Sequence, residues 1–149
     1  MVEFSAGILL YRRTPGLEVF LAHMGGPFWA RKDAAAWSIP KGLYVPGDEE
    51  PLAAALREFA EEIGAPPPDV EYRLLGEFRQ PSGKRITVYA GEGDAQFVAS
   101  NTFELEWPPR SGRMQEFPEM DAGGWFPLDE ARVKILTGQL PTLGALEQV

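Results

Sequence analysis

The sequence predicts one domain of the α+β or mixed α/β class, with helices packed on a sheet. Strand-like segments dominate the N-terminal part, one strongly helical segment lies in the middle, and a second lies near the C-terminus. That order favours helices covering a sheet rather than a helical bundle. The 149 residues, 44% of them hydrophobic, suit one core, and no linker divides residues 1–149.

The N-terminal part of the sheet is predicted from short apolar runs. Residues 4–11 (FSAGILLY) and 18–23 (EVFLAH) have the composition of strands. Residues 12–16 between them supply turn residues, so we expect a hairpin. A loop over residues 25–36 and a short strand over residues 37–39 follow.

The central helix is predicted over residues 51–63. Pro51 suits the first helical turn, where its missing N–H would have no partner. Gly64 is a suitable left-handed stop, and the prolines at 66–68 prevent the helix from continuing.

The C-terminal half is predicted to add further strands and two helices. We expect strands at residues 71–78, 85–90, 103–107 and 125–126, a long loop at 108–124, a helix at 128–136 and a short helix after Pro141.

Composition and charge exclude several classes of protein. A formal charge of −8 argues against a protein that coats nucleic acid by neutralising phosphates. It permits an anionic substrate, because a divalent cation reverses the sign of an acidic site. With no cysteine, disulfides and thiolate metal sites are excluded. No run of about 18 or more apolar residues and no signal-like N-terminus is visible, so we expect no membrane partner and a cytoplasmic location. The oligomeric state is left open.

The central helix is predicted to carry acids on the face opposite its apolar stripe. At about 100° per residue, Glu58, Glu61 and Glu62 share one side. The apolar stripe is formed by Leu52, Leu56, Phe59 and Ile63. Like charges at this spacing destabilise a helix by roughly 0.2–0.5 kcal/mol per pair, and a hard divalent cation would relieve the repulsion. A plain acidic surface is the alternative reading.

The sequence from Gly42, GLYVPGDEEPLAAALREFAEEIGA, resembles the Nudix box. That pattern is Gly, five residues, Glu, seven residues, then Arg-Glu-apolar-any-Glu-Glu-any-Gly-apolar, and residues 57–65 match its second half. Counting back over seven residues from Arg57 reaches Glu49. Six residues rather than five separate Gly42 from Glu49, so either the loop has one extra residue or Asp48 shares the role.

The resemblance extends beyond the box. Residues 37–42 (WSIPKG) are similar to the segment before the box in Nudix enzymes acting on dinucleoside polyphosphates or inositol pyrophosphates. Residues 115–119 and 125–131 resemble the C-terminal segment of the family. The resemblance implies a Nudix α/β/α sandwich around a mixed sheet. It also implies a pyrophosphohydrolase that uses Mg²⁺, with Mn²⁺ as a possible substitute, on a small nucleotide-type substrate.

The resemblance also assigns roles to residues. Glu58, Glu61 and Glu62 would hold the metal ions, and the carbonyl oxygen of Gly42 would touch them. Arg57 would pair with Glu49 and fix the loop against the helix; a surface pair with Glu61 is the alternative. For the base or water-orienting group, Glu116 is our first candidate and Glu119 the second.

Cations and aromatic residues are the candidates for substrate contacts. Arginine and lysine bind phosphate oxygens, so the candidates for phosphate contacts are Lys41, Arg31, Lys32, Arg110 and Arg113. Lys41 ranks first because it adjoins Gly42. Phe28, Trp29 and Trp107 either stack on a base or belong to the core. His23 lies in an apolar strand, which favours a packing role over a catalytic one.

Several substrates stay open. The Pro-Lys-Gly segment favours dinucleoside polyphosphates, with nucleoside triphosphates, nucleotide sugars and capped RNA ends as further candidates. Pro81 occupies a region where ADP-ribose-cleaving relatives favour proline. The rival hypothesis is a non-catalytic Nudix-fold protein that only binds nucleotides.

Overall fold

A mixed sheet runs through the middle of the molecule in the computed structural model, which describes residues 2–13 and 15–149. Its strands lie in the order β3-β2-β1-β6-β5, with β4 paired to β1 and β9 paired to β2. The strands are β1 (Phe4–Arg12), β2 (Glu18–Met24), β3 (Trp37–Ser38), β4 (Lys41–Leu43), β5 (Tyr72–Arg79), β6 (Arg85–Glu92), β7 (Thr102–Glu106), β8 (Met114–Pro118) and β9 (Met120–Pro127). The helices are α1 (Pro51–Ile63), α2 (Leu128–Lys134), the short 3-10 helix η1 (Thr137–Gln139) and α3 (Leu140–Glu147).

Strand β1 is the centre of the sheet. It pairs in parallel with β6 along most of its length. On its other edge it pairs antiparallel with β2 near Tyr11 and with β4 at Ser5–Gly7. The hairpin expected from the sequence is therefore present, and β4 lies beside the N-terminal half of β1.

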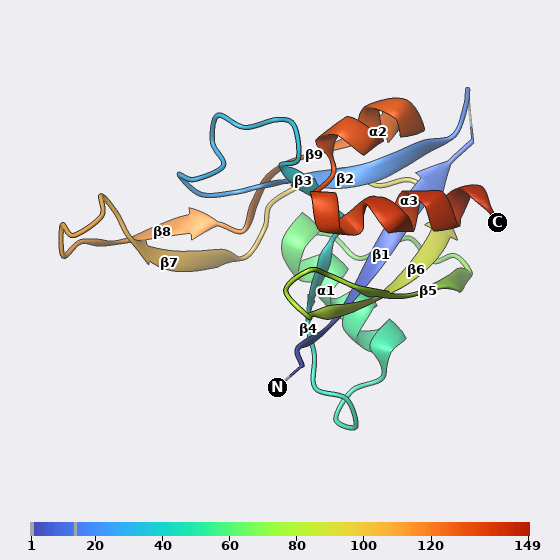
Figure 1. The fold of residues 1–149 in the computed structure, drawn as a ribbon, viewed down its shortest axis with the longest axis horizontal. Coiled ribbons are helices and arrows are strands. Elements are labelled where there is room, and N and C mark those ends of the chain that lie inside the picture. The colour runs from blue at the N-terminus through green and yellow to red at the C-terminus, as the bar shows by residue number, and fades with distance from the viewer. Residues whose placement is uncertain (1, 14) are drawn as a thin grey trace.

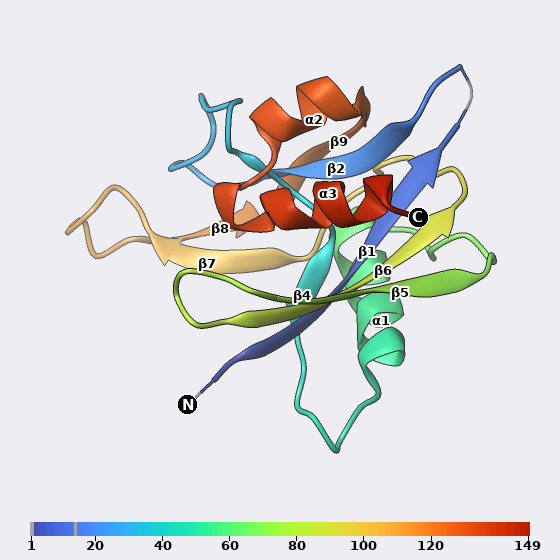
Figure 2. The same cartoon turned by 45° about the vertical axis from the view of Figure 1, so that its right-hand side comes forward.

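Helices cover both faces of this sheet, as Figures 1 and 2 show. One core cluster packs α1 against β1 and β2, through residues such as Ile8, Phe20 and Phe59. The other packs α2 and α3 against the opposite face, through residues such as Leu9, Ile86 and Leu143. The alternating side chains of a strand point to opposite faces, so β1 is buried on both sides. The predicted α/β/α sandwich around a mixed sheet is confirmed.

The expected loop over residues 108–124 is wrong, because it contains strand β8 and most of β9. Two adjacent glycines, Gly123 and Gly124, make this segment read as a loop. In the structure Gly123 pairs with β2, and a Cβ there would lie 2.9 Å from the Phe20 ring. The glycine is therefore a packing requirement in a strand. Strand β4 was also missed, because three residues after a proline give little sequence signal.

Strands β7 and β8 form a two-stranded hairpin, the arm (residues 102–118), that projects from the body of the molecule in both views (Figures 1 and 2). Its root is closely packed. A Cβ on Gly25 would overlap the carbonyl oxygen of Pro118, and one on Gly26 would lie 2.9 Å from the Phe103 ring. The loop at 25–36 and the arm therefore begin side by side.

Gln139 ties the C-terminal segment to the sheet. It is fully buried, its Oε1 accepts a hydrogen bond from the backbone N–H of Ile39 at 3.0 Å, and its Nε2 donates to Ser38 Oγ at 2.9 Å. A buried polar group that loses its hydrogen-bond partner lowers the stability of the fold. This side chain therefore stabilises residues 38–39, which lead into β4.

We predict that Gln139→Leu lowers the free energy of unfolding by about 1–3 kcal/mol, because the buried Ile39 N–H loses its acceptor. Urea unfolding measures the change. Gln148→Leu, at an exposed position, is the matched control and is expected to unfold like the wild type. Equal unfolding midpoints for the two variants would contradict the role of Gln139.

Candidate functional site

Helix α1 carries most of the candidate site and packs on the sheet beside strand β4. It begins at Pro51 and ends at Gly64, whose φ of 84° is left-handed and whose N–H donates to the carbonyl of Ala60. Phe59 and Ile63 are buried as expected, whereas Leu52 and Leu56 are only partly buried. Ala54 and Ala55 complete the buried face, because their small side chains let the helix approach the sheet closely.

Glu62 is buried under strand β4, although it lies on the side of α1 opposite the predicted apolar stripe. It is 8% exposed, and its Oε1 accepts a hydrogen bond from the backbone N–H of Lys41 at 3.1 Å. Burial raises the pKa of Glu62 to about 8, with the carboxylates of Glu58 and Glu119 adding to the rise and Lys41 opposing it. Helical spacing fixes the angle of a side chain, but it does not show that β4 covers that angle.

Glu58 lies against the backbone of Gly42. A Cβ at position 42 would overlap the Glu58 carboxyl group, so only glycine permits this approach. The Glu58 side chain is 12% exposed, and burial raises its pKa although Arg57 acts in the opposite direction. A carboxylate is thus held close to a main-chain segment, away from most of the solvent.

One guanidinium group joins the acidic residues. Nε and Nη2 of Arg57 donate to the two carboxylate oxygens of Glu49, each at 2.9 Å. Nη1 donates to Glu58 at 2.8 Å and to Glu61 at 3.2 Å. The two pairings weighed as alternatives from the sequence, with Glu49 and with Glu61, occur together. The hydrogen bonds from Arg57 hold the pKa of Glu49 below its usual range.

The extra residue in the loop is accommodated by a turn. Gly47 has a φ of 92°, and the backbone N–H groups of Asp48 and Glu49 both donate to the carbonyl of Val45. This turn carries Glu49 to Arg57. In the described part of the chain, the carboxylate that meets this guanidinium from the loop is that of Glu49 and not that of Asp48.

The donor groups fit a hard divalent cation. Within residues 2–13 and 15–149, no three acidic or histidine side chains converge on one point in this arrangement. Glu58 and Glu61 nevertheless share a single positively charged nitrogen, Arg57 Nη1. These two carboxylates supply the kind of oxygen ligand that Mg²⁺ prefers, because it binds through one or two carboxylates and keeps several waters.

Glu119, not Glu116, is the loop acid beside this group. The carboxylate of Glu119 contributes to the raised pKa of Glu62, and its backbone N–H donates to the carbonyl of Asn101. Glu116 is exposed on the arm, opposite Glu104. The structure therefore favours the second candidate for the base or water-orienting group.

The candidate phosphate-binding cations divide into two sets. Lys41 lies on β4 next to Gly42, beside the acids. The others lie elsewhere: Arg31 and Lys32 are exposed in the loop at 25–36, and Arg110 and Arg113 are exposed at the tip of the arm. Only Lys41 is brought to the acidic helix.

His23 has the packing role expected from the sequence. Its ring is buried, with Nδ1 2.7 Å from Asp121 Oδ1 and Nε2 2.6 Å from the carbonyl oxygen of Lys32. Both ring nitrogens are occupied, so the side chain fastens the loop at 25–36 to β2.

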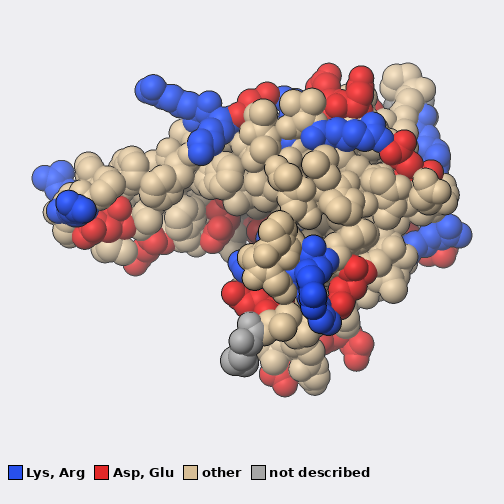
Figure 3. All heavy atoms as spheres, viewed as in Figure 1, with Lys and Arg blue, Asp and Glu red and all other residues tan. Residues whose placement is uncertain are grey.

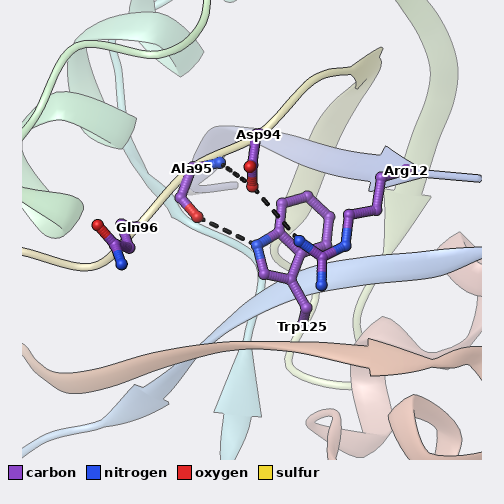
Figure 4. A pocket seen from close by; sticks show the side chains of 5 residues that line it. All are labelled: Arg12, Asp94, Ala95, Gln96 and Trp125. Atoms are coloured by element: carbon purple, nitrogen blue, oxygen red, sulfur yellow. Dashed lines mark hydrogen bonds and ion pairs between the residues drawn. The ribbon is translucent and has the colours of Figure 1, made fainter. Parts of the chain in front are cut away.

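A cavity of about 490 Å³ lies apart from the acids, and sequence reasoning did not find it (Figure 4). Its walls include Arg12 and Trp125, with the guanidinium 4.3 Å from the centre of the indole ring. The same guanidinium pairs with Glu18 at 2.8 Å and Asp94 at 3.5 Å. The Arg12 guanidinium is already paired with two acids and stacked on Trp125. We therefore assign these residues a structural role, in which Arg12 joins β1 to β9.

Comparison with known proteins agrees with the sequence pattern. The family model of the NUDIX domain matches residues 1–144. An RNA pyrophosphohydrolase from Alkalilimnicola ehrlichii is 41% identical over 151 residues, covering 89% of this chain and 81% of that protein. A nucleoside triphosphate pyrophosphatase/Nudix hydrolase fusion protein from Bifidobacterium longum is 32% identical over 114 residues. That match covers 70% of this chain, which spans only 23% of the fusion protein.

Solved structures share the fold. The C. elegans Ap4A hydrolase in a binary complex has a TM-score of 0.64 at 21% identity, covering 97% of this chain and 96% of that one. The NUDIX domain of Shewanella oneidensis NrtR, complexed with ADP ribose, has a TM-score of 0.65 at 18% identity, covering 99% and 88%. At these identities the likeness shows a shared fold alone. Together with the family match, it means that the chain belongs to the Nudix family of hydrolases, enzymes that act on diphosphate bonds.

Proposed function

We propose that this chain is a Mg²⁺-dependent pyrophosphohydrolase that cleaves a diphosphate bond in a nucleotide-type substrate. The observation that carries the proposal is the sharing of one positive nitrogen by Glu58 and Glu61, next to the main chain of Gly42. Such a pair of carboxylates is suited to neutralising a divalent cation that in turn binds phosphate oxygens.

Glu58 and Glu61 would be the first ligands of the cation. Glu62 and the carbonyl oxygen of Gly42 would be further ligands. Bound there, Mg²⁺, or Mn²⁺ in its place, would neutralise phosphate charge and lower the pKa of a coordinated water. Glu62 also fixes β4 through its bond to the Lys41 N–H, so it positions Gly42 against Glu58.

The surrounding residues position the substrate and the water. Arg57 holds the loop through Glu49 with two of its nitrogens, which keeps the acidic face in place. Lys41 is suited to contact a phosphate, because it is the cation nearest in sequence to Gly42 and lies on β4. Glu119 is our candidate for orienting or deprotonating the attacking water, because it lies on the Glu62 side of the group.

The first substrate to test is a dinucleoside polyphosphate, followed by a nucleoside triphosphate. The Pro-Lys-Gly segment before the box supports the former. The name of the 41% identical relative supports a second candidate, the triphosphorylated 5′ end of RNA. The ADP-ribose complex of a structural neighbour keeps ADP-ribose in the panel.

We predict that wild-type protein hydrolyses one substrate class when Mg²⁺ or Mn²⁺ is present, and that Glu61→Gln lowers kcat by about 100-fold or more. The reason is that the amide keeps the shape of the side chain but removes the negative charge of Glu61, which now pairs with Arg57 Nη1 and would bind the cation. Chromatography of products measures the effect over a panel of nucleoside triphosphates, diadenosine polyphosphates, ADP-ribose, inositol pyrophosphates and 5′-triphosphate RNA.

Glu130→Gln is the matched control, since Glu130 is an exposed acid on α2, remote in sequence from the box. Circular dichroism confirms that both variants are folded. Equal turnover by the two variants, or activity that persists in EDTA, would contradict the proposed metal site.

Glu62 predicts a pH dependence of stability in the metal-free protein. Its pKa is about 8 in the folded state against 4.5 for an ordinary glutamate, so the folded state keeps the proton over a wider range of pH. The free energy of unfolding should therefore fall as pH rises from about 4.5 through about 8. Urea unfolding in EDTA at about pH 6 and about pH 9 measures this. Glu62→Gln cannot titrate and should lose that part of the dependence; an unchanged dependence would contradict the burial of a protonated Glu62.

A further inference from the structure

The loop at 25–36 contacts the arm at its root and again nearer its tip. The ring of Phe28 packs edge-on against Trp107, with 5.3 Å between the ring centres and an angle of 81°. Near the tip of the arm, the backbone N–H of Trp107 donates to the carbonyl of Arg113. We call the aromatic pair and the four cations of these two segments the arm–loop surface. Its members are Phe28, Trp107, Arg31, Lys32, Arg110 and Arg113.

This surface starts at the acidic helix. The backbone N–H of Asn101, before the arm, donates to the carbonyl of Glu61 at 2.8 Å. The N–H of Glu119, after the arm, donates to Asn101 at 2.9 Å, and the N–H of Gly25, at the start of the loop, donates to Glu119 at 2.8 Å. The backbone of Glu61 is therefore linked to the roots of both elements. The arm then extends away from the helix by about 16 Å, at about 3.3 Å for each residue of β7.

In the described residues, none of the four cations of this surface forms an ion pair with an acid. The chain has 14 lysines and arginines, and six of them make ion pairs in the described residues, namely Arg12, Arg13, Arg57, Arg85, Arg132 and Lys134. That leaves 14 − 6 = 8 without one in the described part, and four of these eight belong to the arm–loop surface.

The arm also carries three acids, Glu104, Glu106 and Glu116, and in the described residues none of them forms an ion pair with Arg110 or Arg113. Glu104 and Glu116 lie opposite each other on the two strands of the hairpin. They point to the face opposite Phe103 and Phe117, because side chains alternate along a strand. The carboxylate of Glu106 accepts hydrogen bonds from the N–H groups of Arg110 and Gly112, so it caps the tip of the arm. Figure 3 shows the result: blue side chains gather at the far end of the arm, with red along its lower side.

One ring of the aromatic pair is accessible, that of Phe28, whereas Trp107 is only partly exposed. Phe28 is 59% exposed although it is large and apolar. An exposed aromatic ring near cations that form no ion pair can bind single-stranded nucleic acids, because a base stacks on the ring and phosphates contact the cations. With only four cations, the surface suits a short segment of strand, in keeping with a chain whose net charge of −8 disfavours coating.

We propose that the arm–loop surface binds the nucleotides that follow the 5′ end of a single-stranded RNA, while the 5′ diphosphate linkage lies at the acidic helix. This inference rests on the proposed function and names the substrate class of the same site. The arm would make contacts that a mononucleotide cannot reach, because its tip lies well beyond the acids. An RNA chain would then be a better substrate than a nucleoside triphosphate with the same reacting group.

The test is a binding titration that does not require turnover. A 5′-triphosphate hexaribonucleotide with a 3′ fluorophore is titrated with protein in EDTA, and anisotropy gives Kd at several salt concentrations. Phe28→Ala is expected to weaken binding about tenfold through the loss of one stacking contact. Arg110→Ala/Arg113→Ala is expected to reduce the slope of log Kd against log salt by about 1.4, which is about 0.7 for each phosphate contact.

Arg73→Ala/Lys84→Ala is the control, because it removes the same charge from two exposed positions outside the arm and the loop. It should bind like the wild type. Equal losses in both double variants, or wild-type binding by Phe28→Ala and by Arg110→Ala/Arg113→Ala, would overturn the proposal, as would failure of the wild type to bind the hexaribonucleotide.

Hydrolysis separates this inference from the proposed function. With Mg²⁺, the ratio of kcat/KM for the hexaribonucleotide to that for ATP should exceed one in the wild type and fall about tenfold in Phe28→Ala. Oligonucleotide binding without hydrolysis of either substrate would remove the proposed function and leave the binding surface. Hydrolysis of ATP without any preference for RNA would leave the proposed function and remove the binding surface.

Discussion

The guanidinium group of Arg57 is the interaction on which the candidate site depends. It donates to three carboxylates, those of Glu49, Glu58 and Glu61, and its three nitrogens divide these bonds between the loop and the helix. Nε and Nη2 bind the loop acid, so the loop between β4 and α1 is fixed to the helix. Nη1 donates to the two helix acids and so offsets part of their mutual repulsion. The division also means that the bonds of Nη1 can be given up without releasing Glu49.

A second constraint acts with the first: β4 lies across the acidic side of α1. Gly42 lets the Glu58 carboxyl group approach the main chain, and the Lys41 N–H holds Glu62 in a buried position. Burial raises the pKa of both carboxyl groups, which means that the metal-free site holds negative charge at a cost. A cation placed among these oxygens would remove that cost. The site is thus suited to a divalent cation by its electrostatics as well as by its donor atoms.

Sequence patterns predicted the elements whose signal is local, and missed those that depend on distant partners. Helix α1 has the predicted bounds because Pro51 and Gly64 mark its ends, and the apolar runs of β1 and β2 are equally local. Strand β9 contains Gly123 and Gly124, so it reads as a loop, although β2 pairs with it along its length. The same limit applies to the site. Helical spacing grouped the acids, but the burial of Glu62 and the approach of Glu119 come from β4 and from the end of the arm.

The central claim is that the acids of α1 bind a divalent cation, and calorimetric titration with Mn²⁺ tests it most directly. Wild-type protein should bind Mn²⁺ with saturable heat, and Glu58→Gln, which keeps the side chain but not its charge against Gly42, should weaken that binding about tenfold or more. Glu130→Gln, at an exposed position on α2, should bind like the wild type. Equal affinities in all three proteins, or no binding by the wild type, would contradict the account.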